Sequence, residues 1–260
     1  MMHKPLIFVD LDDTLFQTHR RIQPDASFRV ATLDVSGQPL SFMKPKQQQL
    51  VDWMFHCADV VPVTARSVKS LQRVQLDFKH GAVCTHGGVV LTPSQQIDKE
   101  WQAQQKAHLD QLDDLMQQLP DLLQHCAHDF GEIRTWYETQ DQLNIYAVAK
   151  QKNLEVPLFL KDLVDLLPTS VTEQFYIHTN GNNLAIIPHA ISKKNAVEYY
   201  LKKFDPEQQR VILGFGDSLS DFGFLSSCDW FGMPKSSQLH QFTETALQQD
   251  YQTKGFFGHV

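Results

Sequence analysis

A short apolar run that ends in three carboxylates constrains the fold of this chain more than any other stretch. Leu6–Val9 is rich in branched and aromatic side chains, and Asp10, Asp12 and Asp13 follow it. Such a run, ending in charge, predicts a strand buried on both faces of a parallel sheet. Ligand sites in open α/β sheets lie beyond the carboxyl ends of strands, so Asp10 and Asp12 are expected to share one small site. Like charges held so close raise a pKa or require a cation.

The composition limits the classes of protein to consider. The chain has 260 residues, enough for one large domain or two smaller ones. Its formal net charge of −7 gives no global attraction for nucleic acid or anionic membrane, so a phosphate-bearing ligand needs a local site. No apolar stretch is long enough for a signal peptide or a membrane span, and the four cysteines lie far apart. We therefore expect a cytoplasmic protein, monomeric or a small homo-oligomer, that binds neither nucleic acid nor membrane.

Apolar runs and helical stripes alternate on both sides of a central insertion. This alternation predicts a doubly wound parallel-sheet α/β core formed by residues 1–91 and 188–260. Residues 92–187 follow the order helix–strand–strand twice, which predicts an inserted α+β domain with a four-stranded antiparallel sheet and two helices on one face. The expected strands are 6–9, a hairpin over 28–43, 59–66, 82–86, 89–91, 132–139, 143–149, 173–179, 183–187 and 210–214. The expected helices are 46–57, 67–78, 94–128 with a break or kink at Pro120, 154–167 and 192–204.

Further groups with chemical potential lie at the ends of later strands or open a helix. Thr64 and Arg66 end one apolar run, Lys193 opens a helix, and Asp217 and Asp221 follow another run. Each has an ordinary explanation, such as a helix cap, a solvated lysine or a turn. Together they supply what phosphoryl transfer needs: a nucleophile, an acid/base, a cation site and donors around the phosphoryl oxygens.

Four segments resemble, in order, the motifs of the haloacid dehalogenase superfamily. They are Asp10-Leu11-Asp12-Asp13-Thr14, Val60–Thr64, Ile191–Ala196 and Gly216–Asp221. The resemblance implies a Rossmann-like core in which Asp10 is the nucleophile that forms an aspartyl-phosphate, and Asp12 is the general acid/base. It also implies that Thr64 binds the phosphoryl group and that Lys193 offsets negative charge, with the adjacent Lys194 as the alternative lysine.

The same resemblance implies a metal site. Asp10, the backbone carbonyl of Asp12 and Asp217 would bind Mg²⁺, and Asp221 would support it. A set made only of hard oxygen ligands suits this ion.

Within the superfamily, Asp12 favours hydrolysis of phosphate esters, and the inserted α+β cap resembles that of the Cof-type and sucrose-phosphate phosphatases. We therefore expect a magnesium-dependent phosphatase that acts on a small phosphorylated metabolite, a sugar phosphate. Thr64, Arg66 and Lys193 are the expected substrate contacts in the core, although Arg66 is equally consistent with an ordinary helix start. Polar and aromatic residues suited to a sugar lie on or between the cap strands: Arg134, Trp136, Tyr137, Glu138, His178, Asn180 and Asn183. Of these, we select His178 and Asn180 as the expected substrate contacts in the cap.

Two other functions stay open at this point. A phosphotransferase or phosphomutase would transfer the phosphoryl group to a hydroxyl group of another molecule or of the substrate, and not to water. A non-enzymatic phospho-aspartate signalling protein would also combine clustered Asp, Thr and Lys, but such receivers are much shorter and lack a cap.

Overall fold

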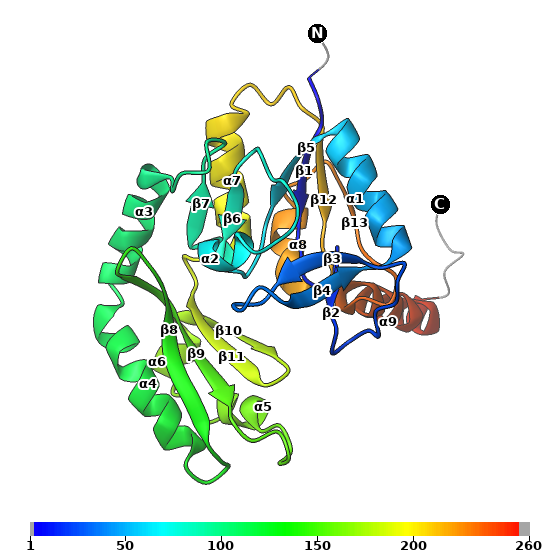
Figure 1. The fold of residues 1–260 in the computed structure, drawn as a ribbon. Coiled ribbons are helices and arrows are strands. Elements are labelled where there is room, and N and C mark those ends of the chain that lie inside the picture. The colour runs from blue at the N-terminus through cyan, green and yellow to red at the C-terminus, as the bar shows by residue number, and fades with distance from the viewer. Residues whose placement is uncertain (1–2, 255–260) are drawn as a thin grey trace. The chain divides into compact units, whose positions relative to one another are not determined.

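The computed structural model of the chain describes residues 3–254, apart from the side chains of Asn180 and of residues 249–254. The chain forms two compact units (Figure 1). The first unit runs up to Ile97 and resumes at Lys193, and the second unit comprises Asp98–Ser192. Within residues 3–254, no helix combines the length and the apolar character needed to cross a membrane.

A four-stranded parallel sheet forms the centre of the first unit. Its strand order is β13 (Trp230–Gly232), β12 (Ile212–Phe215), β1 (Leu6–Val9) and β5 (Asp59–Pro62). Every neighbouring pair is parallel, and Leu6 lies beside Ile212 on one side and Asp59 on the other. The α/β fold class predicted from the sequence is therefore confirmed.

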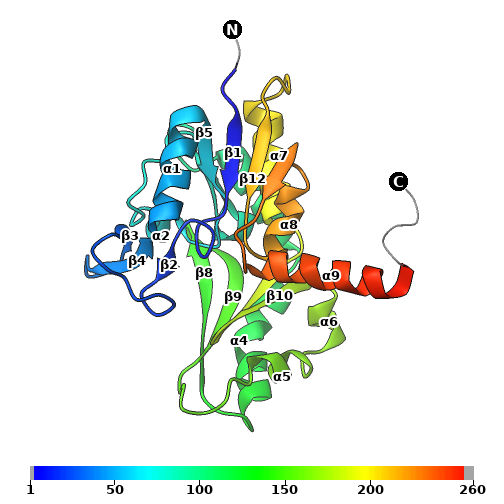
Figure 2. The ribbon, with the colours of Figure 1, turned by 90° about the vertical axis from the view of Figure 1, so that its right-hand side faces the viewer.

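Helices cover both faces of this sheet (Figure 2). The helix α1 (Pro45–Cys57) lies on one side of β1, and α7 (Lys193–Phe204) and α8 (Leu219–Leu225) lie on the other. All four side chains of β1 are buried, as expected for a strand between two helical layers.

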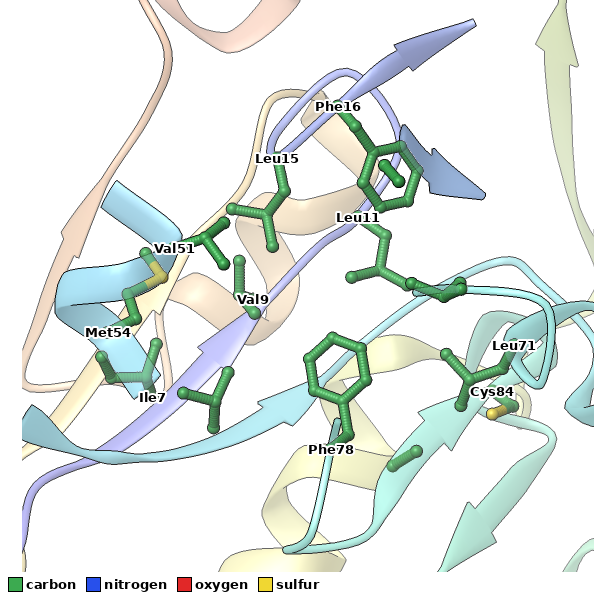
Figure 3. Packing of buried hydrophobic residues seen from close by; sticks show 14 of the residues in the cluster. Ile7, Val9, Leu11, Leu15, Phe16, Val51, Met54, Leu71, Phe78 and Cys84 are labelled. Atoms are coloured by element: carbon green, nitrogen blue, oxygen red, sulfur yellow. The ribbon is translucent and has the colours of Figure 1, made fainter. Parts of the chain in front are cut away.

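Alternate side chains of β1 reach the two helical layers. Ile7 and Val9 belong to the same apolar cluster as Met54 of α1 (Figure 3). Phe8 points the opposite way and meets the ring of Tyr200 on α7 edge to face, with the ring centroids 5.6 Å apart. Because successive strand residues face opposite sides, this short run anchors both layers and fixes where β1 ends.

Smaller elements complete the first unit. They are β2 (Gln17–Thr18), β3 (Arg29–Leu33), β4 (Pro39–Met43), α2 (Val68–Leu71), β6 (Ala82–Cys84), the 3-10 turn η1 (Thr85–Gly87), β7 (Val89–Leu91) and α9 (Gln238–Lys254). The hairpin predicted over 28–43 is confirmed as the antiparallel pair β3–β4. Gly37 in its turn has a φ of 81°, which a residue without Cβ adopts at little cost.

The helix predicted over 67–78 is wrong beyond its first turn, because only Val68–Leu71 is helical. The backbone after it bonds to strand β3 instead of continuing a helix. The Gln75 amide donates to the Ala31 carbonyl at 2.7 Å, and Leu33 donates to Arg73 at 3.0 Å. Hydrogen bonds between segments some forty residues apart cannot be predicted from the helical periodicity of one of them.

The second unit is built on the predicted four-stranded antiparallel sheet. Its strand order is β10 (Phe175–Asn180), β11 (Asn183–Pro188), β9 (Leu143–Gln151) and β8 (Ile133–Gln140). Its helices are α3 (Lys99–Asp110), α4 (Asp113–Ala127), α5 (Leu160–Val164) and α6 (Thr169–Thr172). One apolar cluster joins α4, α5 and α6 to the sheet, and includes Leu123, Leu163 and Ala149.

Two helical predictions in this unit need correction. The chain breaks between α3 and α4 at Gln111–Leu112, and Pro120 lies inside α4. Of the helix predicted over 154–167, only Leu160–Val164 forms. The Gln151 side chain accounts for the second difference, since its amide donates to the carbonyl of Asn153 at 2.8 Å and holds the following segment as a loop.

Pro120 is tolerated inside α4 because another group replaces its missing hydrogen bond. Proline has no N–H to offer the carbonyl four residues earlier, that of Met116. The Tyr137 hydroxyl of β8 donates to this carbonyl at 2.5 Å. The backbone acceptor that proline orphans is therefore satisfied from the sheet.

Replacing Tyr137 with Phe is expected to destabilise the second unit by about 1–2 kcal/mol, since it leaves a buried acceptor unpaired. The free energy of unfolding measured with urea would show the loss. The matched control is a double-mutant cycle with Pro120→Ala, because alanine restores a backbone N–H that can bond to the Met116 carbonyl. In that background the loss from Tyr137→Phe should shrink, and an equal loss in both backgrounds would contradict this account.

Local contacts explain where the two units divide, at 97/98 and 192/193 rather than at the predicted 91/92 and 187/188. The Thr92 amide donates to the Gln96 carbonyl at 2.8 Å, and Leu91 forms an antiparallel β-bridge with Ile97. The turn over residues 92–96 is therefore bonded to β7 and belongs to the first unit. At the other end, Ile191 belongs to an apolar cluster of the second unit. The roles of the units as catalytic core and cap stay predictions.

Candidate active site

Three loops leave the same edge of the parallel sheet, and each carries predicted site residues. Asp10 follows β1, Thr64 follows β5, and Asp217 follows β12. The Asp10 amide donates to the Phe215 carbonyl at 2.8 Å, and the Val63 amide donates to the Val9 carbonyl at 2.8 Å. The ladder thus continues to the start of each loop and brings their side chains to one edge, where open α/β sheets bind ligands.

Three carboxylates and one ammonium group form the centre of this edge. Oxygens of Asp10, Asp217 and Asp221 lie within 4.8 Å of one another. The Nζ atom of Lys193 donates to Asp10 at 2.7 Å and to Asp221 at 2.6 Å. Lys194, the alternative lysine, is half exposed with its Nζ 3.8 Å from Glu198, so Lys193 is the one that faces the carboxylates.

Burial and mutual contact set the protonation of this cluster. Burial raises the pKa of Asp10 well above its ordinary value, and attraction to Lys193 only partly offsets it. Burial would likewise raise the pKa of Asp221, but Lys193 and the bonds from Ser218 outweigh it, and this pKa is lowered. The pKa of Lys193 is raised because Asp10 and Asp221 outweigh its burial.

Asp217 is the least compensated of the three carboxylates. Burial, followed by repulsion from Asp221 and Asp13, raises its pKa from 3.8 to about 7. One ammonium therefore serves three carboxylates, and the cluster carries excess negative charge when all are ionised. An arrangement of this kind favours binding of a cation.

The donor atoms of the cluster fit Mg²⁺. Asp221 is occupied by the protein: one oxygen accepts from Lys193, and the other accepts the Ser218 amide at 2.9 Å and the Asp217 amide at 3.2 Å. Asp10 and Asp217 face each other across Thr14, whose Oγ1 lies 3.3 Å from Asp10 Oδ2 and 3.4 Å from Asp217 Oδ1. These carboxylates are hard oxygen donors of the type Mg²⁺ takes. Thr14 is a site residue for which the sequence analysis found no such role.

The loop that carries Asp217 is tightly built around Asp221. A Cβ atom at Gly216 would lie 2.6 Å from Asp221 Cβ, so only glycine fits there. The Ser218 hydroxyl donates to Asp221 at 2.7 Å, and Ser218 and Asp221 together cap the start of α8. This explains the Gly-Asp-x-x-x-Asp pattern in physical terms: the second Asp shapes the loop that presents the first.

The Asp12 carboxylate pairs with Arg66 and is not part of the carboxylate cluster. Its two carboxylate oxygens accept from Arg66 Nε at 2.6 Å and Nη2 at 2.7 Å. Any metal contact from Asp12 would thus come from its backbone carbonyl. Asp13, next in the loop, has a φ of 64° and forms an ion pair with Arg21 at 2.5 Å, a pair that the sequence did not predict.

Thr64 is 1% exposed. Its backbone amide donates to Val83 at 2.8 Å, and its Oγ1 accepts the Arg66 amide at 3.1 Å. The hydroxyl oxygen is thereby oriented while its proton remains able to donate. Because Thr64 is buried, solvent does not compete for this hydroxyl.

The remaining predicted substrate contacts belong to the second unit. His178 lies on β10 opposite Ala185 of β11, and its ring centroid is 6.2 Å from that of Tyr176. Asn180 ends β10, and its side chain lies outside the described part of the chain. Tyr137 is directed to α4, so it shares no face with Trp136 and Glu138 beside it.

Known structures share this architecture. The sucrose-phosphatase of Synechocystis, solved with sucrose and phosphate, aligns with a TM-score of 0.55 at 16% identity, covering 96% of this chain and 99% of that one. The C-terminal domain of the C. albicans trehalose-6-phosphate phosphatase aligns with a TM-score of 0.53 at 14% identity, over 87% and 73% of the two chains. A trehalose-6-phosphate phosphatase related protein gives 0.51 at 16%, over 94% and 99%. No curated protein matches the chain.

One family matches this chain over most of its length. Residues 46–250 match the family described as sucrose-6F-phosphate phosphohydrolase. This range includes Thr64, Lys193, Asp217 and Asp221, and the fold is that of the structures above. The chain is therefore a phosphoric monoester hydrolase of the haloacid dehalogenase superfamily and belongs to the sucrose-6F-phosphate phosphohydrolase family.

Proposed function

We propose that this protein is a magnesium-dependent phosphatase that hydrolyses a phosphorylated sugar in two steps through an aspartyl-phosphate at Asp10. The observation that carries the proposal is the cluster of buried Asp10, Lys193 and Asp221 with half-buried Asp217 at the carboxyl edge of the sheet. A carboxylate at a position where a lysine and a cation can offset the charge of an incoming phosphate is a suitable nucleophile.

In the first step, an oxygen of Asp10 attacks phosphorus and the bond to the sugar oxygen breaks. Asp12, protonated at this stage, gives its proton to the leaving oxygen. Lys193 lies 2.7 Å from Asp10 and keeps its charge because its pKa is raised, so it offsets the negative charge of nucleophile and phosphate together. The Thr64 hydroxyl donates to an oxygen of the phosphoryl group.

In the second step, water attacks phosphorus and gives a proton to the Asp12 carboxylate. The bond between phosphorus and Asp10 breaks, which releases inorganic phosphate and restores both side chains. Mg²⁺ would be held by Asp10, the backbone carbonyl of Asp12 and Asp217, and when bound it neutralises phosphate charge. Asp221 would support the site by shaping the loop of Asp217.

One face of the second unit suits a sugar. Because Tyr137 faces α4, its neighbour Trp136 faces the other side of the sheet. Strand pairing places Trp136, Val148, Ala185 and His178 in one cross-strand row, in which Val148 and Ala185 are buried in an apolar cluster and the two rings flank them. The Arg134 guanidinium lies 5.2 Å from the Trp136 ring centroid. Aromatic surface for the apolar side of a sugar ring, with polar groups for its hydroxyls, is typical of such sites.

The family match and the fold shared with sucrose- and trehalose-phosphate phosphatases support a disaccharide phosphate as the substrate class. We expect the purified chain to release inorganic phosphate from sucrose 6F-phosphate with Mg²⁺, and to lose this activity in EDTA. Trehalose 6-phosphate and glucose 6-phosphate are the comparison substrates. Transfer of phosphate to added sucrose or glucose in place of release would instead indicate a phosphotransferase, and no turnover of any ester would contradict the proposal.

A further inference from the structure

Arg66 makes a contact that the proposed mechanism has not yet used. Its guanidinium presents two parallel N–H bonds, at 2.6 and 2.7 Å, to the two carboxylate oxygens of Asp12. The Arg66 side chain is 12% exposed, whereas that of Asp12 is 45% exposed. The Arg66 guanidinium is therefore largely buried, whereas the Asp12 carboxylate is accessible to solvent. Bidentate pairs of this type fix the plane of a carboxylate as well as its position.

Other groups hold the guanidinium. Its carbon atom lies 5.4 Å from the ring centroid of Phe16, within the range of a cation–π contact. Its Nη1 atom donates to Ser70 Oγ at 3.4 Å. With one face on an aromatic ring and its N–H groups engaged by Asp12 and Ser70, Arg66 has little freedom to change rotamer.

The backbone of Arg66 is fixed from both sides. Its amide donates to Thr64 Oγ1 at 3.1 Å, and its carbonyl accepts the Thr85 amide at 2.8 Å. The next amide, of His86, donates to the Thr64 carbonyl at 3.1 Å. Thr85 and His86 both have a φ of 56°, a left-handed conformation that is unfavourable for a β-branched residue such as threonine. Strain of this kind persists only where the surroundings enforce it, and it is concentrated at functional sites.

We infer that Arg66 is a positioning residue that aims the Asp12 carboxyl at the leaving oxygen of the substrate. This inference rests on the proposed function. Each carboxylate oxygen has two lone-pair sites, so Asp12 can accept from Arg66 and still carry the proton that it transfers. That proton passes to the sugar oxygen as its bond to phosphorus breaks, and Asp12 regains one from water in the second step. Arg66 itself transfers nothing, and its fork is occupied by Asp12 rather than by substrate phosphate.

The test compares two aryl esters that differ in their need for a general acid. p-Nitrophenyl phosphate has a leaving group that departs without a proton, whereas phenyl phosphate benefits from one. In Arg66→Gln, kcat/KM for phenyl phosphate should fall about 10²-fold, at the lower end of the range for general acid–base catalysis, and that for p-nitrophenyl phosphate should change little. Arg66→Lys retains the charge but not the fork, and should show the same selective loss. Lys69→Gln, which removes an exposed cation on the short helix α2 that follows Arg66, is the matched control.

Two further measurements separate this role from its alternatives. In the Asp12→Asn background, Arg66→Gln should cause no further loss with phenyl phosphate, because the two residues act as one unit. Inhibition by inorganic phosphate should be unchanged in Arg66→Gln. Equal losses with both esters, together with weaker inhibition by phosphate, would show that Arg66 binds the phosphoryl group and would overturn the inference. Equal losses with a lowered melting temperature would show a structural role and overturn it too. Neither outcome touches the role of Asp10, which is tested separately.

Discussion

Replacing Asp10 with Asn is expected to lower kcat by at least about 10⁴-fold. Removal of a covalent nucleophile has effects of this size in other enzymes. Asparagine has nearly the same shape, but its amide is a poor nucleophile towards phosphorus. It also gives up the negative charge that Lys193 pairs with at 2.7 Å. The variant should remain folded, because Asp221 still pairs with Lys193 at 2.6 Å.

Mass spectrometry of rapidly quenched protein provides the direct measurement. Wild-type protein mixed with p-nitrophenyl phosphate and Mg²⁺ should gain the mass of one phosphoryl group on the peptide that contains Asp10. Asp10→Asn should gain none. Asp12→Asn should retain the added mass for longer than wild type, since the second step lacks its base.

Asp13→Asn is the matched control for this experiment. It makes the same change of carboxylate to amide in the same loop, and asparagine tolerates the left-handed backbone at that position. It should keep most of the activity. Phosphorylation of Asp10→Asn, or turnover by it near the wild-type rate, would remove Asp10 from its proposed role.

The parts of the fold that could be predicted from sequence are those that depend on local pattern. The apolar run Leu6–Val9 predicts a strand buried on both faces, and the structure places it inside a parallel sheet. The meeting of Asp10 and Asp217, which are 207 positions apart, was expected only from the resemblance of the motifs, because no local pattern reports it. Their oxygens lie within the same 4.8 Å cluster.

The parts that could not be predicted depend on contacts between segments. The stretch after Leu71 has helical periodicity, but Gln75 bonds to Ala31 of the hairpin and ends the helix. Gln151 similarly holds the loop after β9 through side-chain bonds that no periodicity reports. In both cases tertiary hydrogen bonds outweigh a helix propensity that is worth only a few tenths of a kcal/mol per residue.

The same distinction applies to the site. Motif order identifies which residues to examine, and helix phase decides that Lys193 rather than Lys194 faces Asp10. The pairing of Asp12 with Arg66 depends on the course of two loops that lie far apart in the chain. The sequence left Arg66 between a substrate contact and a helix start. Only the geometry shows that its guanidinium meets Asp12.

Replacing Asp217 with Asn is expected to have opposite effects on stability and on function. Without metal, the Asp217 carboxylate is unfavourable in the folded state, because burial and the charges of Asp221 and Asp13 raise its pKa from 3.8 to about 7. At pH 8 it is ionised in both states, and its charge costs free energy only in the folded one. In EDTA at pH 8, Asp217→Asn should therefore raise the melting temperature by about 2–4 °C, for roughly 1 kcal/mol after allowance for partial exposure.

The sign of this effect follows from the raised pKa. A carboxylate whose pKa is higher in the folded state destabilises that state above the unfolded pKa, and the penalty is complete once the pH exceeds the folded pKa. The difference in melting temperature between Asp217→Asn and wild type should thus grow from pH 5 to pH 8. A difference that shrinks over this range would contradict the assigned cause.

Addition of Mg²⁺ should reverse the order of the two proteins. Wild type should gain stability as the ion binds the folded state, whereas Asp217→Asn should gain much less, because a charged ligand has been replaced by a neutral one. Its Mg²⁺-dependent phosphatase activity should fall by at least about 10²-fold. Asp52→Asn, which removes an exposed carboxylate paired with Arg29 at 3.0 Å, should keep both the activity and the Mg²⁺ response. A full Mg²⁺ response in Asp217→Asn would show that the ion binds elsewhere, and the carboxylate cluster would then lose its role as the metal site.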